Sequence, residues 1–146
     1  MPTYVCHTRP GLLDPDRRAE LARRMTAVHA AATGAPSPFV QVLFRETEPA
    51  GHFVGGRAAD RDAVFVHGHI RAGRTEEAKH RLLLGLRDEV VAVAAVPVEA
   101  VWVYLSELAP ADMVEFGRVL PDPGHEPGWI AGLPAPLRDR FAEPDG

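Results

Sequence analysis

The second residue of the chain is a proline that opens an apolar segment, residues 2–8, which reads as a β-strand. If Met1 is removed, Pro2 becomes an N-terminal secondary amine. An α-amino group titrates near pH ~8 in model peptides, and burial or a neighbouring charge shifts that value. Such an amine exchanges a proton at physiological pH, so Pro2 is a candidate general acid or base. Because proline fills 14 of the 146 positions, a chance placement is the alternative.

Two arginines, Arg71 and Arg74, lie between a predicted strand and a helix capped by Thr75. A helix N-terminus carries partial positive charge, so cations there are unfavourable unless an anion is bound. Two guanidinium groups beside such a terminus make a site for a carboxylate. The alternative is a pair of solvated loop arginines, since the basic residues of the chain are 15 arginines and one lysine.

Three further residues are weaker candidates. His29 comes one turn after Met25 on the first predicted helix, where a histidine more often fills a core or boundary position. Tyr104 lies in the last predicted strand, where a buried tyrosine usually packs and finds one partner for its hydroxyl. Glu115 falls on a predicted short helix over residues 110–118, where a solvated carboxylate is the commoner role.

The sequence offers little for a metal or a cofactor, and we expect none. His67 and His69 share one face of a predicted strand, but the spacing supplies no third ligand for zinc. The chain has no phosphate-binding loop, no nucleophile elbow and no Cys/His metal pattern.

Composition indicates one globular domain over residues 1–146, with 46% hydrophobic and 25% charged residues. A net charge of −4 gives no case for a nucleic-acid partner, and no apolar run approaches the ~20 residues of a membrane span. Cys6 is the only cysteine, which excludes an intrachain disulfide. Together with the lack of a secretory leader, this favours a cytoplasmic protein.

The order of expected elements repeats along the chain. Asp14 is an N-cap followed by proline at the first helical position, and Gly34 stops that helix. The first half has a strand over 2–8, a helix from Pro15 to Thr33-Gly34, a strand over 39–44 and a loop over 48–62 with room for a short hairpin. The second half has a strand over 63–67, a helix from Thr75 to about Ala95, a strand over 101–105 and the short helix over 110–118.

A shift of 61 residues lays Tyr4 on Phe65 and Val40 on Val101. We therefore predict an α/β fold of two fused β-α-β units, related by duplication, with parallel strands within each unit. Unit one covers about 2–62, unit two about 63–118, and the tail is 119–146. The Pro- and Gly-rich tail is expected to be irregular up to a last short helix over 134–141, with Trp129 anchoring it on a neighbouring surface, another subunit included.

Several of these segments together resemble the tautomerase superfamily, and most closely its cis-3-chloroacrylic acid dehalogenase family. The likeness extends over nearly the whole chain. The segments that carry it are Pro2-Thr3-Tyr4, His29, Arg71-Ala-Gly-Arg74, Val101-Trp-Val-Tyr104, Met113-Val-Glu115-Phe-Gly-Arg118 and Leu120 to Trp129. The resemblance implies a homotrimer that needs no cofactor.

The resemblance also implies roles at the substrate carboxylate. Pro2 would give or take a proton at the carbon next to that carboxylate. Arg71 and Arg74 would bind the carboxylate and polarise the conjugated bond, and His29 would contact the carboxylate as well. Fixed guanidinium groups stabilise the charge that conjugate addition places there.

Glu115, helped by Tyr104, would activate a water that attacks the β carbon, so that a 3-chloroacrylate loses chloride and gives malonate semialdehyde. Two positions depart from the family pattern. Phe116 stands where relatives often have tyrosine, and Ala72 replaces another small or acidic residue between the arginines.

The favoured function is therefore cofactor-independent hydration or hydrolytic dehalogenation of a small unsaturated carboxylate. One alternative is a keto-enol tautomerase acting on a 2-oxo acid such as phenylpyruvate, with Pro2 as the base and Glu115 uninvolved. The other is a non-catalytic oligomeric scaffold.

Overall fold

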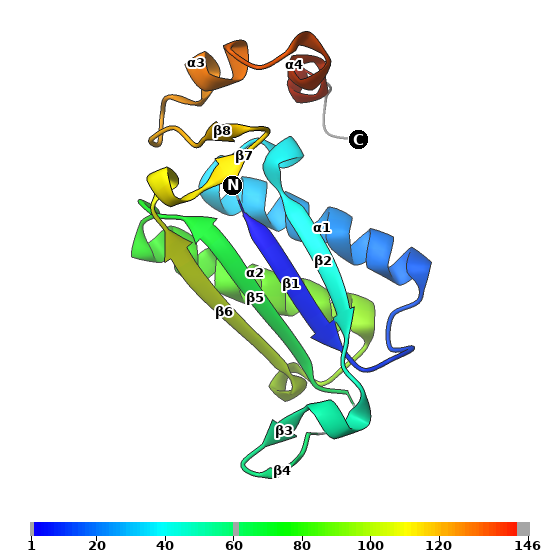
Figure 1. Cartoon of the computed structure of the whole chain (residues 1–146). Coiled ribbons are helices and arrows are strands. Elements are labelled where there is room, and N and C mark those ends of the chain that lie inside the picture. The colour runs from blue at the N-terminus through cyan, green and yellow to red at the C-terminus, as the bar shows by residue number, and fades with distance from the viewer. Residues whose placement is uncertain (1, 60–61, 143–146) are drawn as a thin grey trace.

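A four-stranded sheet with two long helices on one face forms the body of the protein (Figure 1). The computed structural model describes residues 2–59 and 62–142. The strand order is β2-β1-β5-β6. The strands are β1 Thr3–Thr8, β2 Gln41–Glu46, β5 Val64–Arg71 and β6 Val101–Leu108, and the helices are α1 Pro15–Thr33 and α2 Glu76–Ala94.

The sheet confirms the two predicted β-α-β units. β1 pairs with β2 in parallel, and β5 pairs with β6 in parallel. The central pair, β1 with β5, is antiparallel, with Thr3 opposite His69. The N-terminal end of β1 therefore lies beside the C-terminal end of β5. β2 begins two residues later than expected, because Ser37–Phe39 forms a 3-10 turn, η1.

Local capping signals set the ends of both helices as expected. The Asp14 side chain accepts a hydrogen bond from the Arg17 amide at 2.8 Å, and Gly34 ends α1 at a φ of 69°. The Thr75 hydroxyl accepts one from the Ala78 amide at 3.1 Å at the start of α2. Both ends of α2 lie 61 residues after those of α1.

The same offset relates two β-hairpins. β3 Phe53–Val54 and β4 Arg57–Ala58 form the short hairpin for which the loop had room, and β7 Val114–Glu115 and β8 Arg118–Val119 form the second. The predicted helix over 110–118 is therefore wrong beyond the 3-10 turn η4, Pro110–Asp112. Phe116 and Gly117 have φ angles of 51° and 78°, which make a two-residue hairpin turn that no helix can contain.

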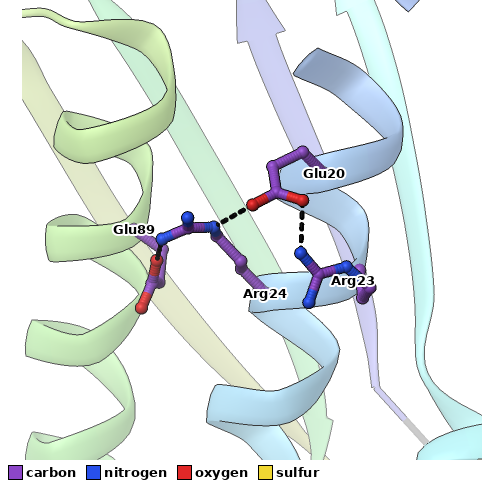
Figure 2. Close-up of polar contacts among 4 residues, drawn as sticks. All are labelled: Glu20, Arg23, Arg24 and Glu89. Carbon is purple, nitrogen blue, oxygen red and sulfur yellow. Dashed lines mark hydrogen bonds and ion pairs between the residues drawn. The ribbon is translucent and has the colours of Figure 1, made fainter. Parts of the chain in front are cut away.

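The main core lies between the sheet and the two helices. Its fully buried side chains include Tyr4, Cys6, Leu21, Met25, Val66, Leu82, Leu86 and Val90. On the outer side of the helices, Arg24 of α1 donates to Glu20 at 2.6 Å and to Glu89 of α2 at 2.9 Å (Figure 2). Arg23 also pairs with Glu20. Partly exposed pairs of this kind add little free energy, and of these three contacts Arg24–Glu89 is the one that joins the two helices.

The opposite face of the sheet carries no helix (Figure 1), and we call it the open face. Side chains alternate between the two faces of a strand, and the register assigns to the open face Thr3, Val5, His7, Gln41, Leu43, Arg45, Phe65, His67, His69, Trp102, Tyr104 and Ser106. None of these twelve is a carboxylate. Trp102 is 46% exposed and Tyr104 is 54% exposed, so this face is apolar, basic and uncovered in the single chain.

The C-terminal segment forms a second, smaller core around Phe39. α3 Glu126–Ala131 lies where an irregular chain was expected, and α4 Ala135–Ala142 lies close to the predicted last helix. Trp129 packs against Phe39 in this core, and its indole nitrogen donates to the Val119 carbonyl at 2.8 Å. Trp129 thus anchors the tail on its own chain. In the part of the chain that is described, no helix is long and apolar enough to cross a bilayer.

Candidate active site

Four of the six predicted site residues line one cavity, which we call the proline cavity. These are Pro2, His29, Arg71 and Arg74. Because β1 and β5 are antiparallel, the start of one strand meets the end of the other, and this brings Pro2 to the arginine loop. α1 supplies His29 from its buried side. The remaining lining residues are Ala35, Pro36, Phe39 and Glu126.

Arg71 is held by the C-terminal segment. Its side chain is only 7% exposed and forms an ion pair with Glu126 of α3. A second nitrogen of the same guanidinium donates to the Pro121 carbonyl at 3.0 Å. Burial raises the pKa of Glu126, but hydrogen bonds from Arg71 and from backbone amides outweigh it and lower the pKa overall. Glu126 therefore stays ionised, and the sequence had given no sign of it.

Arg74 joins the ends of the two long helices. Its guanidinium donates to the carbonyl of Thr33, the last residue of α1, at 2.9 Å. Burial and the positive charge of Arg71 both lower the pKa of Arg74, although an arginine remains charged at any physiological pH. The two guanidinium groups thus share one cavity with the carboxylate of Glu126, and their binding of a substrate carboxylate stays a prediction.

His29 lies at the base of the proline cavity and is 2% exposed. The Tyr4 hydroxyl and the Nδ1 atom of His29 are 2.6 Å apart. Burial and the charge of Arg74 lower the pKa of His29 to about 4. Its imidazole is therefore neutral at pH 7, and burial raises the pKa of Tyr4 well above its ordinary value, so the phenol keeps its proton.

Glu115 lies in a cavity that adjoins the proline cavity, with Phe39 in the lining of both. The β7–β8 hairpin presents Glu115, because the two-residue turn follows it directly. Burial raises the pKa of Glu115, while positive charge, that of Arg71 included, opposes that rise. The carboxylate thus lies within the electrostatic field of Arg71, and its role as a base stays a prediction.

Known proteins are similar to this chain in sequence and in fold. Residues 1–131 match the family Tautomerase_3, whose description is "Putative oxalocrotonate tautomerase enzyme". The solved structure of N1, a member of the cis-3-chloroacrylic acid dehalogenase family, is 38% identical, covers 96% of this chain and 98% of its own, and superposes with a TM-score of 0.91. This chain belongs to the cis-3-chloroacrylic acid dehalogenase family of the tautomerase superfamily.

More distant relatives of this dehalogenase-family chain share the duplicated fold. A native fused 4-OT is 28% identical, covers 80% of this chain and 94% of its own, and has a TM-score of 0.74. The structure of Q0, a fused 4-OT described as a symmetric trimer, is 26% identical, covers 77% of this chain and 90% of its own, and has a TM-score of 0.71. No curated protein matches the chain.

Tyr104 is the predicted site residue that the fold does not bring to the proline cavity. It lies on the open face, where its ring meets Phe65 edge-on with the centroids 5.1 Å apart. Tyr4 and His29 lie on the other side of the sheet, beneath the helices. Within one chain of this dehalogenase-family protein, Tyr104 is therefore not among the residues that line the proline cavity or the Glu115 cavity.

Phe116, the departure from the family pattern, has a structural role. Its positive φ costs about 1 kcal/mol for a residue with a side chain. The ring contacts Phe39, Trp129 and Phe141, with centroids 6.4, 6.3 and 5.6 Å away. These contacts offset the backbone strain and tie the hairpin that bears Glu115 to the C-terminal segment.

The histidine pair of the sequence lies on the open face. The rings of His67 and His69 are 4.3 Å apart between centroids, and Nε2 of His67 is 2.8 Å from the Ser106 hydroxyl oxygen. Within residues 2–59 and 62–142, no three histidine, cysteine or acidic side chains gather in a way that could hold a metal ion.

A further cavity, the twin cavity, lies at positions shifted by the duplication offset. Its lining includes Val54, Val64, Ala100 and Trp102, at the positions that Glu115, Thr3, Phe39 and Gln41 take in the Glu115 cavity. Ala63 also lines it, in the place of Pro2. The twin cavity thus repeats part of the lining of the site, with Val54 at the position of Glu115 and Ala63 at that of Pro2, while His52, Glu99 and Tyr104 are its own titratable groups.

Proposed function

We propose that this chain is a cofactor-independent enzyme for small α,β-unsaturated carboxylates, which adds water to an acetylenic acid or to a cis-3-haloacrylate and yields malonate semialdehyde. The observation that supports it is the shared lining of the proline cavity by Pro2, His29 and the two arginines, with Glu115 in the adjoining cavity. In the proposed reaction the two arginines bind the anion, Pro2 donates a proton and Glu115 is the base.

Binding begins with the substrate carboxylate. Arg71 and Arg74 offer positive charge, and the neutral imidazole of His29 offers one N–H. During conjugate addition, electron density moves from the reacting double or triple bond toward the carboxylate. Because these donors are already fixed by Glu126, Thr33 and Tyr4, they stabilise that charge without reorganising.

Proton transfer divides between Glu115 and Pro2. Glu115 takes a proton from water as the water oxygen bonds to the β carbon, and the protonated amine of Pro2 gives its proton to the α carbon. Burial raises the pKa of Glu115, which makes it a stronger base near neutral pH. With a haloacrylate, the halohydrin so formed loses halide and a proton to give the aldehyde. With an acetylenic acid, the enol formed tautomerises to the same product.

The amine test is direct. Mass spectrometry of purified protein should show that Met1 is absent, because only then is Pro2 an amine. Turnover of propiolate and cis-3-chloroacrylate should be lost in Pro2→Ala, since a primary amine differs in basicity and geometry. Normal turnover by protein that fully retains Met1 would refute the role of Pro2.

We further propose a homotrimer in which the open face is covered and Tyr104 serves the site of a neighbouring subunit. The trimeric fused 4-OT relative and the exposure of Tyr104 support this assembly. Mixed trimers of Pro2→Ala and Tyr104→Phe subunits test it. Each variant alone should be impaired, while mixed trimers should regain activity, because a subunit with intact Pro2 then receives an intact Tyr104. Failure to regain activity in proven mixed trimers would count against the proposal.

Keto-enol tautomerisation of a 2-oxo acid is the second candidate. It needs only Pro2 as the base and the arginines for the carboxylate, and the proline cavity holds these without Glu115. Enol phenylpyruvate is the diagnostic substrate. Turnover of it alone would favour the tautomerase, and turnover of none of the substrates would favour a non-catalytic scaffold.

A further inference from the structure

Tyr4 is a buried residue that contacts His29, one of the residues that line the proline cavity. It lies two residues after Pro2 on β1, is fully buried, and faces the helices. Gly68 lies opposite Tyr4 on β5, and a Cβ atom at Gly68 would come within 2.6 Å of the tyrosine ring. Because Gly68 has no side chain, the ring of Tyr4 can lie against this part of β5.

The direction of the hydrogen bond between Tyr4 and His29 depends on the tautomer of His29. The two polar atoms are 2.6 Å apart, and in the described part of the chain His29 is the polar partner of the Tyr4 hydroxyl. Burial keeps the phenol protonated by raising the pKa of Tyr4. A neutral imidazole has one donor nitrogen and one acceptor nitrogen. A buried phenol that donates to Nδ1 leaves no O–H unpaired, whereas a phenol that only accepts from Nδ1–H leaves its own O–H without an acceptor, and this cost favours Nδ1 as the acceptor.

We propose that Tyr4 is a positioning residue that fixes the tautomer of His29, keeping the ring proton on Nε2, where it can be donated to the substrate carboxylate. This inference rests on the proposed function for the identity of the acceptor. The tautomer itself is a property of the unliganded protein.

The tautomer decides whether His29 attracts or repels an anion. With the proton on Nε2, the ring offers a donor to a carboxylate. With the proton on Nδ1, Nε2 offers a lone pair, which opposes a carboxylate. Protonation of both nitrogens would remove the choice, but burial and Arg74 lower the pKa of His29 to about 4. At neutral pH the hydroxyl of Tyr4 is therefore the group that determines which nitrogen of His29 carries the proton.

The first test is the nitrogen-15 NMR spectrum of histidine-labelled protein at pH 7, which distinguishes the two tautomers. The comparison is between the unaltered protein, Tyr4→Phe and Cys6→Ala, with His29→Gln to assign the signal. Cys6 is buried two residues further along the same strand and contacts Met25, so Cys6→Ala controls for a disturbed core. We expect His29 to carry its proton on Nε2 in the unaltered protein and in Cys6→Ala, and to lose that preference in Tyr4→Phe.

Two spectra would overturn the proposal. One is a His29 proton on Nδ1 in the unaltered protein, a result that needs no variant to fold. The other is an unchanged Nε2–H signal in Tyr4→Phe whose circular dichroism shows a native fold.

The second test is kinetic. Loss of one hydrogen bond to a charged group changes kcat/KM by about tenfold, so Tyr4→Phe should lose about that much, mainly through KM, and Cys6→Ala should not. Unchanged kinetics in Tyr4→Phe would overturn the link to substrate binding. If no substrate is turned over by the unaltered protein, the proposed function fails, while the NMR result still decides the role of Tyr4.

Discussion

Arg71 of β5 and Glu126 of α3 form a buried ion pair inside the proline cavity, 55 positions apart in the chain. The pair brings the C-terminal segment into the site and balances one of the two guanidinium charges. The side chain of Arg71 is less exposed than that of Glu126. If Glu126 lost its charge, the guanidinium of Arg71 would therefore be the buried charge left without its partner.

Replacement of this partner should be costly. Breaking a buried pair by removing one charge costs about 3–5 kcal/mol, and Glu126→Gln, which keeps an acceptor, should lose about 2 kcal/mol of unfolding free energy in urea. Glu76→Gln is the matched control, because Glu76 is 92% exposed and pairs with Lys79 at the surface. Equal stability of the two variants would show that the pair contributes nothing beyond a surface contact.

Glu115→Gln separates the two enzyme functions. The amide keeps the size of the side chain and cannot take a proton from water, so turnover of propiolate or cis-3-chloroacrylate should fall about 10²–10⁴-fold. Tautomerisation of enol phenylpyruvate should survive. Retention of both activities would exclude Glu115 as the base, and loss of both would assign it to support of Pro2.

The pH profile adds a second signature of Glu115. Burial raises the pKa of this carboxyl, and the base is active only when ionised. The kcat/KM for hydration should therefore fall as the pH drops through a value above the ordinary glutamate range. The acidic limb should be missing from the residual activity of Glu115→Gln, and an identical limb in both proteins would assign it to another group.

His29 should make the fold sensitive to acid. The pKa of His29 is about 4 in the folded protein against 6.5 for a free imidazole. Between these two pH values the unfolded chain binds a proton at His29 and the folded chain does not. The stabilisation is fully present above pH 6.5, and about 3 kcal/mol of it is lost as the pH falls to about 4. Urea unfolding at several pH values should show a smaller loss in His29→Asn than in His80→Asn, whose histidine is exposed.

The open face should make assembly depend on pH. His7 shares it with His67, His69 and Arg45, and the two cavities beside His7 and Phe65 are also lined by Arg9, Glu48, His52, Glu99 and Tyr104. Burial, followed by Arg45 and neighbouring histidines, already lowers the pKa of His7. Covering this face disfavours the charged form of His7 further, so the assembly should weaken as the pH falls below the ordinary range of an imidazole.

Sedimentation at pH 8 and pH 5 measures this effect. The assembly formed by the unaltered protein should dissociate at the lower pH, and the assembly of His7→Gln should dissociate less. Equal stability of the unaltered assembly at both pH values would contradict the prediction.

Local signals in the sequence were sufficient for the helices but not for the whole site. Asp14 and Thr75 mark helix starts through contacts three residues away, which a sequence displays directly. The helix expected around Glu115 failed because a phenylalanine at positive φ is a rare start for a hairpin turn. Glu126 was missed because its partner is distant in the chain.

The face on which Tyr104 lies follows from strand alternation and register. That Tyr104 lines neither the proline cavity nor the Glu115 cavity was not apparent until the strand pairing was known. The resemblance assigned Tyr104 to the site from a motif, and a motif in sequence does not say where the fold places a side chain, so its catalytic role stays a prediction.

A polypeptide has one amino terminus, and the duplicated architecture meets that limit at Ala63. The nitrogen of Ala63 is locked in an amide, which neither accepts nor releases a proton near neutral pH, so the twin cavity had no catalyst from the moment the two halves were joined. Val54 stands at the offset position of Glu115, and the acidic and basic side chains that line the twin cavity, His52 and Glu99, stand where the other half has Met113 and Pro38. Covalent fusion thus leaves one cavity beside the start of the chain and a second, related cavity that no terminal amine can reach.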